Sequence, residues 1–227
     1  MIRRAGPTIA LLACAGLLAC GGEDPPAPAT RPADVVLEFD GLTITRGEIE
    51  AFFPYLEALD PTLGLNYRRR VILAKHLIPL KLAQRAFAEP RAGLKARAEA
   101  LVRNVGNGGY PDLVAKSRHM GGYQAKDPLS RNELAFAATP FAFDREHLGQ
   151  VRGPIEVPQG FVVLATAHVT DALTKVMEKA EVWQVPFFHH DGAAFGKWVE
   201  EALRAAGRKV TYVHPEYRDV LPKEFQT

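Results

Sequence analysis

The chain has very little cysteine: only Cys14 and Cys20 among its 227 residues. Because both lie in the first twenty positions, the rest of the chain can form no internal disulfide and offers no cysteine nucleophile. The chain also lacks a large excess of positive or negative charge. Its formal net charge is +2, and no sustained run of lysine and arginine occurs. Nucleic-acid binding usually shows as a strongly basic face, so we predict no nucleic-acid partner.

Signatures of hydrolysis and phosphate binding are missing as well. Ser117 and Ser130 lie in no nucleophile-elbow context. The glycine-rich stretch 106–109 is not followed by the Lys-Ser or Lys-Thr pair of a phosphate-binding loop. We therefore predict that the chain uses no cofactor.

Histidines are present but form no metal-binding motif. The densest group, at 189–191, is His-His-Asp, and adjacent residues on a strand point to opposite faces. No HExxH or HxH partner lies near it, so we predict no metal. His76 is expected at a partly buried position in a helix, and His119 and His147 in loops where either could line a groove.

The first twenty residues have the layout of a secretory signal. Two arginines precede an apolar run over residues 9–19, which is shorter than the roughly 20 residues that span a bilayer. Leu-Leu-Ala at 17–19 followed by Cys20 resembles a bacterial lipobox. We predict a signal segment over residues 1–19 and lipid attachment at Cys20; the alternative is an ordinary signal whose cysteines are merely small.

A polar, proline-rich stretch follows Cys20 as far as residue 34. Proline stiffens such a spacer without giving it a core, so residues 20–34 are predicted to be a tether. Gly21 stands directly after the cysteine, so an inner-membrane retention signal of the aspartate type is absent. We expect a lipid-anchored protein of the bacterial cell envelope that faces the periplasm or the exterior, at the outer membrane if the cell has two.

The folded part opens with a hairpin signal. The β-prone stretches 35–39 and 42–44 flank Asp40-Gly41, a pair typical of a two-residue turn. Thr45 and Glu48 have the spacing of a capping box, which predicts a helix from there through residue 56.

Periodicity and chain breakers predict the other elements. Helices are expected over 67–88, 91–105, 111–118, 129–138 and 193–206, and strands over 151–156, 161–169, 181–189 and 209–213. Pro79 should kink the first of these helices or end it early. Gly160 permits a positive φ in the turn between the first two of these strands. Helices mixed with antiparallel-type strands indicate the α+β class.

Two segments resemble one known family. The stretch VVLEFDGLTITRGEIEAFF (35–53), with the later helix RRRVILAKHLIPLKLAQRAF (68–87), resembles the N-terminal chaperone region of SurA- and PrsA-type foldases. Residues 97–169 are similar to the body of a parvulin-type peptidyl-prolyl isomerase domain, most closely at GQVRGPIEVPQGFVVL (149–164).

This resemblance implies both a domain organisation and a substrate pocket. It places a helical SurA-like module at 35–90, a small parvulin-like antiparallel-sheet domain at 91–171 and a C-terminal strand-helix-strand segment at 172–227. Leu129 falls near the methionine of the family's pocket, and Phe141 or Phe143 near its phenylalanine. The residues implied to bind substrate are Leu129, Phe136, Phe141, Phe143 and Phe161.

The chain departs from the family at two histidines. The first parvulin strand, which carries one of them, is missing before residue 97, and Val162 stands where the closing hairpin carries the other. The stretch 181–191 loosely resembles the missing strand. Either a permuted domain inserts this strand into the sheet, or the strand is an addition to the C-terminal part. The aromatic residues around it suit a core or an apolar peptide-binding face.

The resemblance implies a folding factor for exported proteins. Rotating a prolyl bond requires an apolar pocket and a few oriented polar groups, without a nucleophile or a metal. We therefore predict a peptidyl-prolyl isomerase and chaperone whose partners are unfolded exported chains and, through the anchor, the membrane. The alternative is a non-catalytic peptide-binding chaperone, or an envelope assembly lipoprotein, of the same fold.

Overall fold

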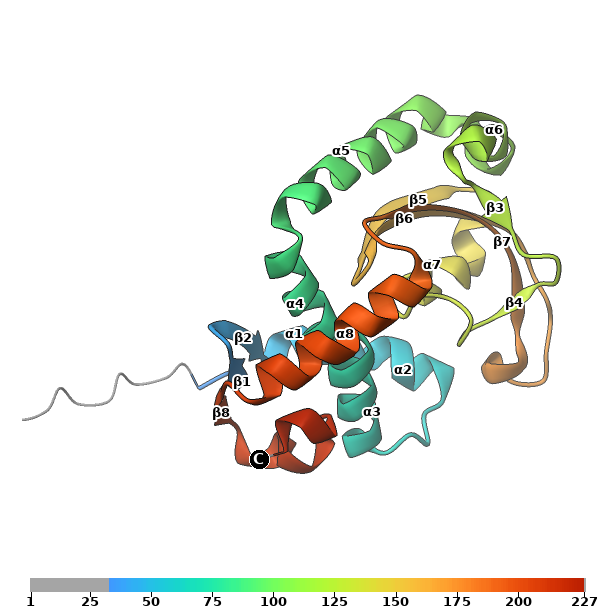
Figure 1. Ribbon diagram of the computed structural model, residues 1–227. Helices are drawn as coiled ribbons and strands as arrows, with labels where there is room; N and C mark the ends of the chain where they lie inside the picture. Colours follow the sequence, from blue (N-terminus) through green and yellow to red (C-terminus); the bar gives the residue numbers. More distant parts are fainter. Residues whose placement is uncertain (1–32, 227) are drawn as a thin grey trace, which may run out of the picture. The chain divides into compact units, whose positions relative to one another are not determined.

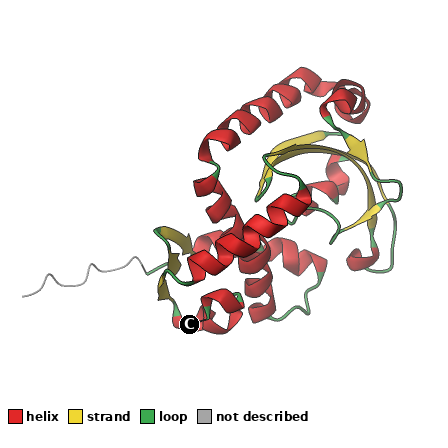
Figure 2. Cartoon of the chain, in the orientation of Figure 1, coloured by secondary structure: helices red, strands yellow, loops and turns green. Residues whose placement is uncertain are grey.

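The computed structural model describes residues 33–226, which belong to one compact unit. The predicted signal, Cys20 and nearly all of the tether lie outside the described residues. The compact unit combines helices with two antiparallel sheets (Figures 1 and 2), so the α+β class is confirmed. Within residues 33–226, no helix is both long enough and apolar enough to cross a membrane.

The first sheet joins the two ends of this unit. Its strand order is β2-β1-β8, with β1 (Val35–Phe39) between β2 (Leu42–Thr45) and β8 (Val210–Val213), and both pairings are antiparallel. Asp40 and Gly41 form the turn between β1 and β2 with positive φ angles of 49° and 75°. The predicted hairpin is therefore confirmed.

The capping box after this hairpin is also confirmed. Thr45 and Glu48 exchange hydrogen bonds at the start of α1 (Arg46–Glu50), with the Thr45 amide 2.9 Å from the Glu48 carboxylate. The prediction of one helix through residue 56 is wrong, because α1 ends early and α2 (Phe53–Leu59) begins separately. Pro54 lies in the first turn of α2, where a residue without an N–H is tolerated. The same proline could not donate the hydrogen bond needed to continue α1.

The long helix predicted over 67–88 is interrupted ahead of its proline. α3 (Leu65–Ile72) runs into a π-helical turn (Leu73–Leu77), and α4 (Ile78–Ala86) follows with Pro79 in its first turn. Because Pro79 donates no backbone hydrogen bond, a break at this point is expected. α5 (Ala88–Val105) comes directly after α4.

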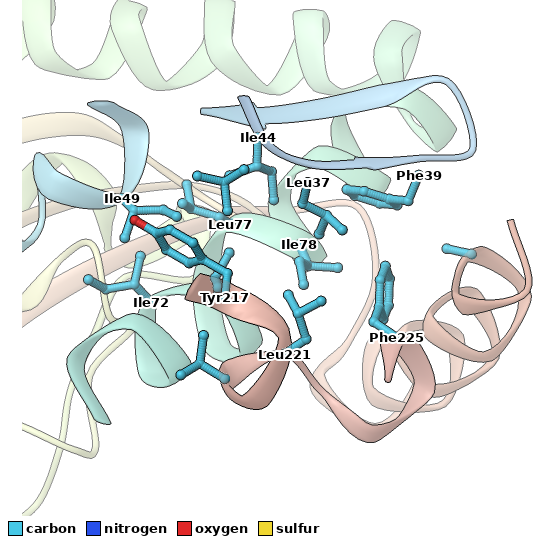
Figure 3. Packing of buried hydrophobic residues seen from close by; sticks show 14 of the residues in the cluster. Leu37, Phe39, Ile44, Ile49, Ile72, Leu77, Ile78, Tyr217, Leu221 and Phe225 are labelled. Atoms are coloured by element: carbon cyan, nitrogen blue, oxygen red, sulfur yellow. The ribbon is translucent and has the colours of Figure 1, made fainter. Parts of the chain in front are cut away.

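The first hydrophobic core lies between this sheet and helices α1 to α4 (Figure 3). The C-terminal turns Pro215–Val220 and Lys223–Phe225 complete it, with Tyr217 and Phe225 almost wholly buried. The Phe225 ring meets the Phe39 ring edge-on at 5.2 Å between centroids. No element was predicted for these last residues, which are nevertheless part of the N-terminal core.

The second sheet has the strand order β3-β7-β6-β5. Its three long strands are β5 (Val151–Val157), β6 (Gly160–Val169) and β7 (Lys179–Phe188); the short strands β3 and β4, at 123–124 and 129–130, pair with β7. β7 pairs with β6 from Gly160↔Phe188 to Val169↔Ala180. Residues of the stretch 181–191 therefore form a strand in the same sheet as the β5–β6 hairpin, which is the first of the two alternatives given for this stretch.

This sheet is covered on both faces. α5 and α6 (Gly109–Ser117) lie over its outer face, and the short α7 (Thr139–Ala142) lies within its concave face (Figure 1). The C-terminal part predicted as 172–227 is divided, since β7 belongs to this sheet while α8 (Gly192–Gly207) and the residues after it contribute to the first core.

The prediction of a helix over 129–138 is wrong. Leu129 and Ser130 instead pair with β7 at Ala180 and Lys179, and the Ser130 amide then donates to the Glu133 carboxylate at 2.7 Å, in a turn. The apolar residues of this stretch cover the concave face of the second sheet, so tertiary packing overrides helix propensity here.

Gly160 supports a prediction about stability. Its φ is +147°, and a Cβ built on it would lie 2.1 Å from the Phe187 carbonyl oxygen of the neighbouring strand. We expect Gly160→Ala to lower the free energy of unfolding by about 2 kcal/mol, because both the backbone angle and the close approach require glycine. Urea titration measures this, with Gly196→Ala as the control since nothing lies within 4 Å of its Cβ position. Equal stability of the two variants would contradict the argument.

Candidate functional site

A cavity of about 670 Å³ lies between the N-terminal helices and the second sheet. We call it the junction cavity. Helical residues form one side of it, and residues of α7 and β5 form the other. Its lining residues are Glu48, Ala51, Phe52, His76, Leu77, Leu80, Ala137, Phe141, Gly153, Pro154, Ile155 and Glu156.

The cavity lies against the outer edge of β5. Four consecutive residues of β5, Gly153 to Glu156, line it, although successive side chains of a strand point to opposite faces. Four consecutive residues can all line the cavity only if the edge of the strand, and not one of its faces, borders it. Pro154 has no N–H to donate, and the pairing of β5 with β6 has a register shift between Arg152 and Ile155. A proline and a bulge in an edge strand disfavour the addition of another strand. The geometry is better suited to an inserted side chain.

His76 is the most unusual group in the cavity wall. The π-helical turn places it among aromatic rings, 4.7 Å from Phe52 and 5.8 Å from Phe136 between centroids. His76 is only 3% exposed, and its Nδ1 atom has no hydrogen-bond partner among the described residues. Burial lowers the pKa of His76 to about 4, against the opposing effect of the Glu156 carboxylate. The imidazole is therefore neutral at pH 7.

Both carboxylates of the cavity already have cationic partners. Lys81 Nζ lies 2.6 Å from Glu48, and Arg91 Nη2 lies 2.7 Å from Glu156. Burial alone would raise the pKa of Glu48, but the Lys81 bond and the capping bond from Thr45 leave it below its usual value. The site therefore combines apolar walls with a neutral polar group and two compensated charges.

The five residues implied by the family resemblance are dispersed. Phe141 lines the cavity and is 37% exposed, and Phe136 packs behind the wall against Phe52 and His76. Leu129 and Phe143 are part of the core on the concave face of the second sheet. Phe161 is 5% exposed on the opposite face, under α5 and α6. The structure therefore does not bring the five together in one pocket.

A second hollow of about 550 Å³ is lined by Phe136, Tyr55 and residues of the α2–α3 region. Phe136 contacts Tyr55 at 5.4 Å between centroids as well as His76. A single layer of aromatic rings thus lies between this hollow and residues of the junction cavity.

The other histidines singled out by the sequence lie elsewhere. His189 stacks on Phe87 at 4.0 Å between centroids, and burial is the main cause that lowers its pKa. His147 Nδ1 lies 2.7 Å from the Asp144 carboxylate near the surface, and His119 is exposed. None of them lines the junction cavity.

Most of the cavity cannot be recognised in the sequence. The local patterns identify Glu48 only as a capping residue, Glu156 only as part of a strand, and His76 only as a helix residue. The nearest signal was Pro79, which predicted a break in the helix close to His76. The surroundings of His76 depend on packing with residues up to eighty positions later in the chain. No local sequence pattern reveals which residues these are.

Comparison with known proteins gives no match: no family model, curated protein or solved structure corresponds to this chain. The resemblance to SurA- and PrsA-type foldases therefore stays a prediction that rests on the short motifs quoted above.

Proposed function

We propose that this protein is a lipid-anchored folding factor of the bacterial cell envelope that binds unfolded exported polypeptides in the junction cavity. The observation that carries the proposal is the cavity itself, an apolar hollow with Phe141 partly exposed in its wall. Large apolar side chains at such sites are typical of binding surfaces for apolar groups. The signal-like segment and the lipobox at Cys20 would bring this cavity to the compartment where exported chains fold.

Binding without catalysis is the form of this proposal that the geometry favours. The residues implied for a prolyl pocket are dispersed, and Phe143 and Phe161 are buried in two separate cores. Isomerase activity remains the second candidate, because the junction cavity has apolar walls and volume for a prolyl ring. Such a reaction needs only differential stabilisation of the twisted amide.

Phe141→Ala should weaken the binding of unfolded protein about tenfold, because the ring contributes apolar contact area in the cavity wall. The midpoint of thermal unfolding should change little, since the ring is partly exposed. Affinity for reduced, carboxymethylated α-lactalbumin measures the effect, using the soluble unit from Ala33. Leu148→Ala is the matched control, because Leu148 is 38% exposed and lies outside the cavity lining.

A proline-limited refolding assay separates the two candidates. Acceleration by the wild-type unit that is lost in Phe141→Ala would favour the isomerase. Binding of unfolded protein without acceleration would favour the chaperone. If the wild-type unit neither binds unfolded chains nor slows their aggregation, the proposed function is wrong.

A further inference from the structure

The junction cavity contains one polar group whose hydrogen-bonding capacity is unused. His76 is buried from solvent, and the described residues give its Nδ1 no partner. A buried polar atom left unpaired is costly in free energy, and buried polar groups in proteins almost always have a hydrogen-bond partner. Because His76 lines the cavity, a molecule bound there contacts this side chain, and a turn of the buried ring would let that molecule supply the partner.

The surrounding charges favour an uncharged partner. Glu48 and Glu156 are each paired with a cation, so neither requires a charged ligand. His76, Glu48 and Glu156 also do not form a group whose ligand atoms lie close enough to hold a metal ion; within residues 33–226 only Asp144, Glu146 and His147 meet that condition. An ionic group entering the apolar cavity would lose its hydration without a free counter-charge to replace it.

A peptide group has the complementary chemistry. A neutral imidazole has one donor and one acceptor nitrogen, and a main-chain amide has one N–H and one C=O. The apolar walls formed by Phe52, Leu77, Leu80 and Ile155 suit a side chain next to that amide. Because β5 carries Pro154 and a bulge in its pairing with β6, addition of a bound segment as another strand is disfavoured, and the segment depends more on this single polar contact.

We infer that His76 recognises the main chain of bound polypeptides: its imidazole hydrogen-bonds a peptide group while the adjacent apolar side chain fills the junction cavity. The preferred ligand is an uncharged, extended segment with one apolar side chain. This inference rests on the proposed function and adds to it the chemical class of the bound segment.

The inference is tested by combining changes in the peptide with substitutions of His76 and comparing the binding affinities. The probes are the fluorescein-labelled, capped peptide with sequence Gly-Ala-Leu-Ala-Gly and two analogues in which one amide beside the leucine is replaced by an ester. We expect the wild-type unit to bind one ester analogue about tenfold more weakly than the amide peptide, because the ester lacks the N–H and has a weaker acceptor. His76→Leu should bind the amide peptide about tenfold more weakly and no longer distinguish it from the esters.

Two further variants control for folding and position. His76→Gln retains a neutral donor and acceptor, so its affinity should remain within about threefold of wild type. His119→Leu removes an exposed histidine away from the cavity and should change nothing. If His76→Leu does not fold, as judged by circular dichroism, the wild-type and His76→Gln measurements with the esters still decide the question.

The possible failures are distinguishable. Equal binding of amide and ester peptides by the wild-type unit, or undiminished binding by a folded His76→Leu, overturns the role of His76. If unfolded α-lactalbumin binds while the capped peptide does not, this inference is wrong and the proposed function stands. If neither ligand binds, both are wrong.

Discussion

Replacing Arg91 with alanine should lower the free energy of unfolding by about 4 kcal/mol, the largest single-residue effect expected in this protein. Arg91 is only 4% exposed although it is always charged. Its guanidinium donates to the carbonyl oxygens of Val157 and Pro158 at 3.1 and 2.8 Å and to the Glu156 carboxylate at 2.7 Å. It also lies over the Phe161 ring, 5.4 Å from the centroid.

The size of the effect follows from what alanine leaves behind. Two backbone acceptors at the end of β5 would lose their donor, and a cavity would open between α5 and the sheet. Arg91→Lys should not restore stability, because an ammonium group cannot make the forked set of bonds. Arg97→Ala on the same helix is the control; its guanidinium is exposed and lies 5.6 Å from the Phe187 ring centroid, so we expect a loss below about 1 kcal/mol. A loss of that small size for Arg91→Ala, in urea titrations, would refute this account of the α5–β5 contact.

His76 should make the unit less stable in mild acid. Its pKa is about 4 in the folded protein and about 6.5 in an unfolded chain. The unfolded chain therefore binds the proton first as the pH falls, and stability falls with it between about pH 6.5 and pH 4. The shift corresponds to about 3 kcal/mol, which is fully present as stability above pH 6.5 and lost by about pH 4.

The variant His76→Leu isolates this contribution. Urea titrations at pH 7.5, 5.5 and 4.5 should show a gap between wild type and variant that changes by about 2.5 kcal/mol across the range. His189, whose pKa is also lowered, contributes in the same direction but is present in both proteins and cancels from the difference. If the free energies of unfolding of the two proteins changed in parallel with pH, the pKa of His76 would be the same in the folded and unfolded states. The description of His76 as a buried neutral imidazole would then be wrong.

Local signals in the sequence predicted the elements whose formation is decided locally. Asp40-Gly41 has the positive φ angles that a two-residue hairpin turn needs, and Thr45 and Glu48 cap α1 as their spacing predicts. Gly160 adopts a positive φ as expected. In each case the deciding interactions lie within a few residues of one another, so a short window of sequence contains the relevant physics.

Elements decided by distant contacts were predicted less well. The stretch 129–138 has helical composition but packs against β6 and β7, and the pairing of β4 with β7 determines where it lies. The dispersal of the five pocket residues has the same origin, because Phe141 and Phe161 lie on different sides of a sheet whose order no local pattern reveals. His76 acquires its aromatic environment only when Phe136, sixty positions later, packs against the π-helical turn.

The pairing of β1 with β8 has a consequence for the order of events during biogenesis. Leu37 pairs with Val213, and Phe39 packs against Phe225, so the first core cannot be completed until nearly the whole chain is available. Contacts this distant in sequence also form slowly, since a long loop must close first. For a chain exported as proposed, this delay would keep the N-terminal half open and threadable during translocation, and arrival of the last residues would then close the structure on the far side of the membrane.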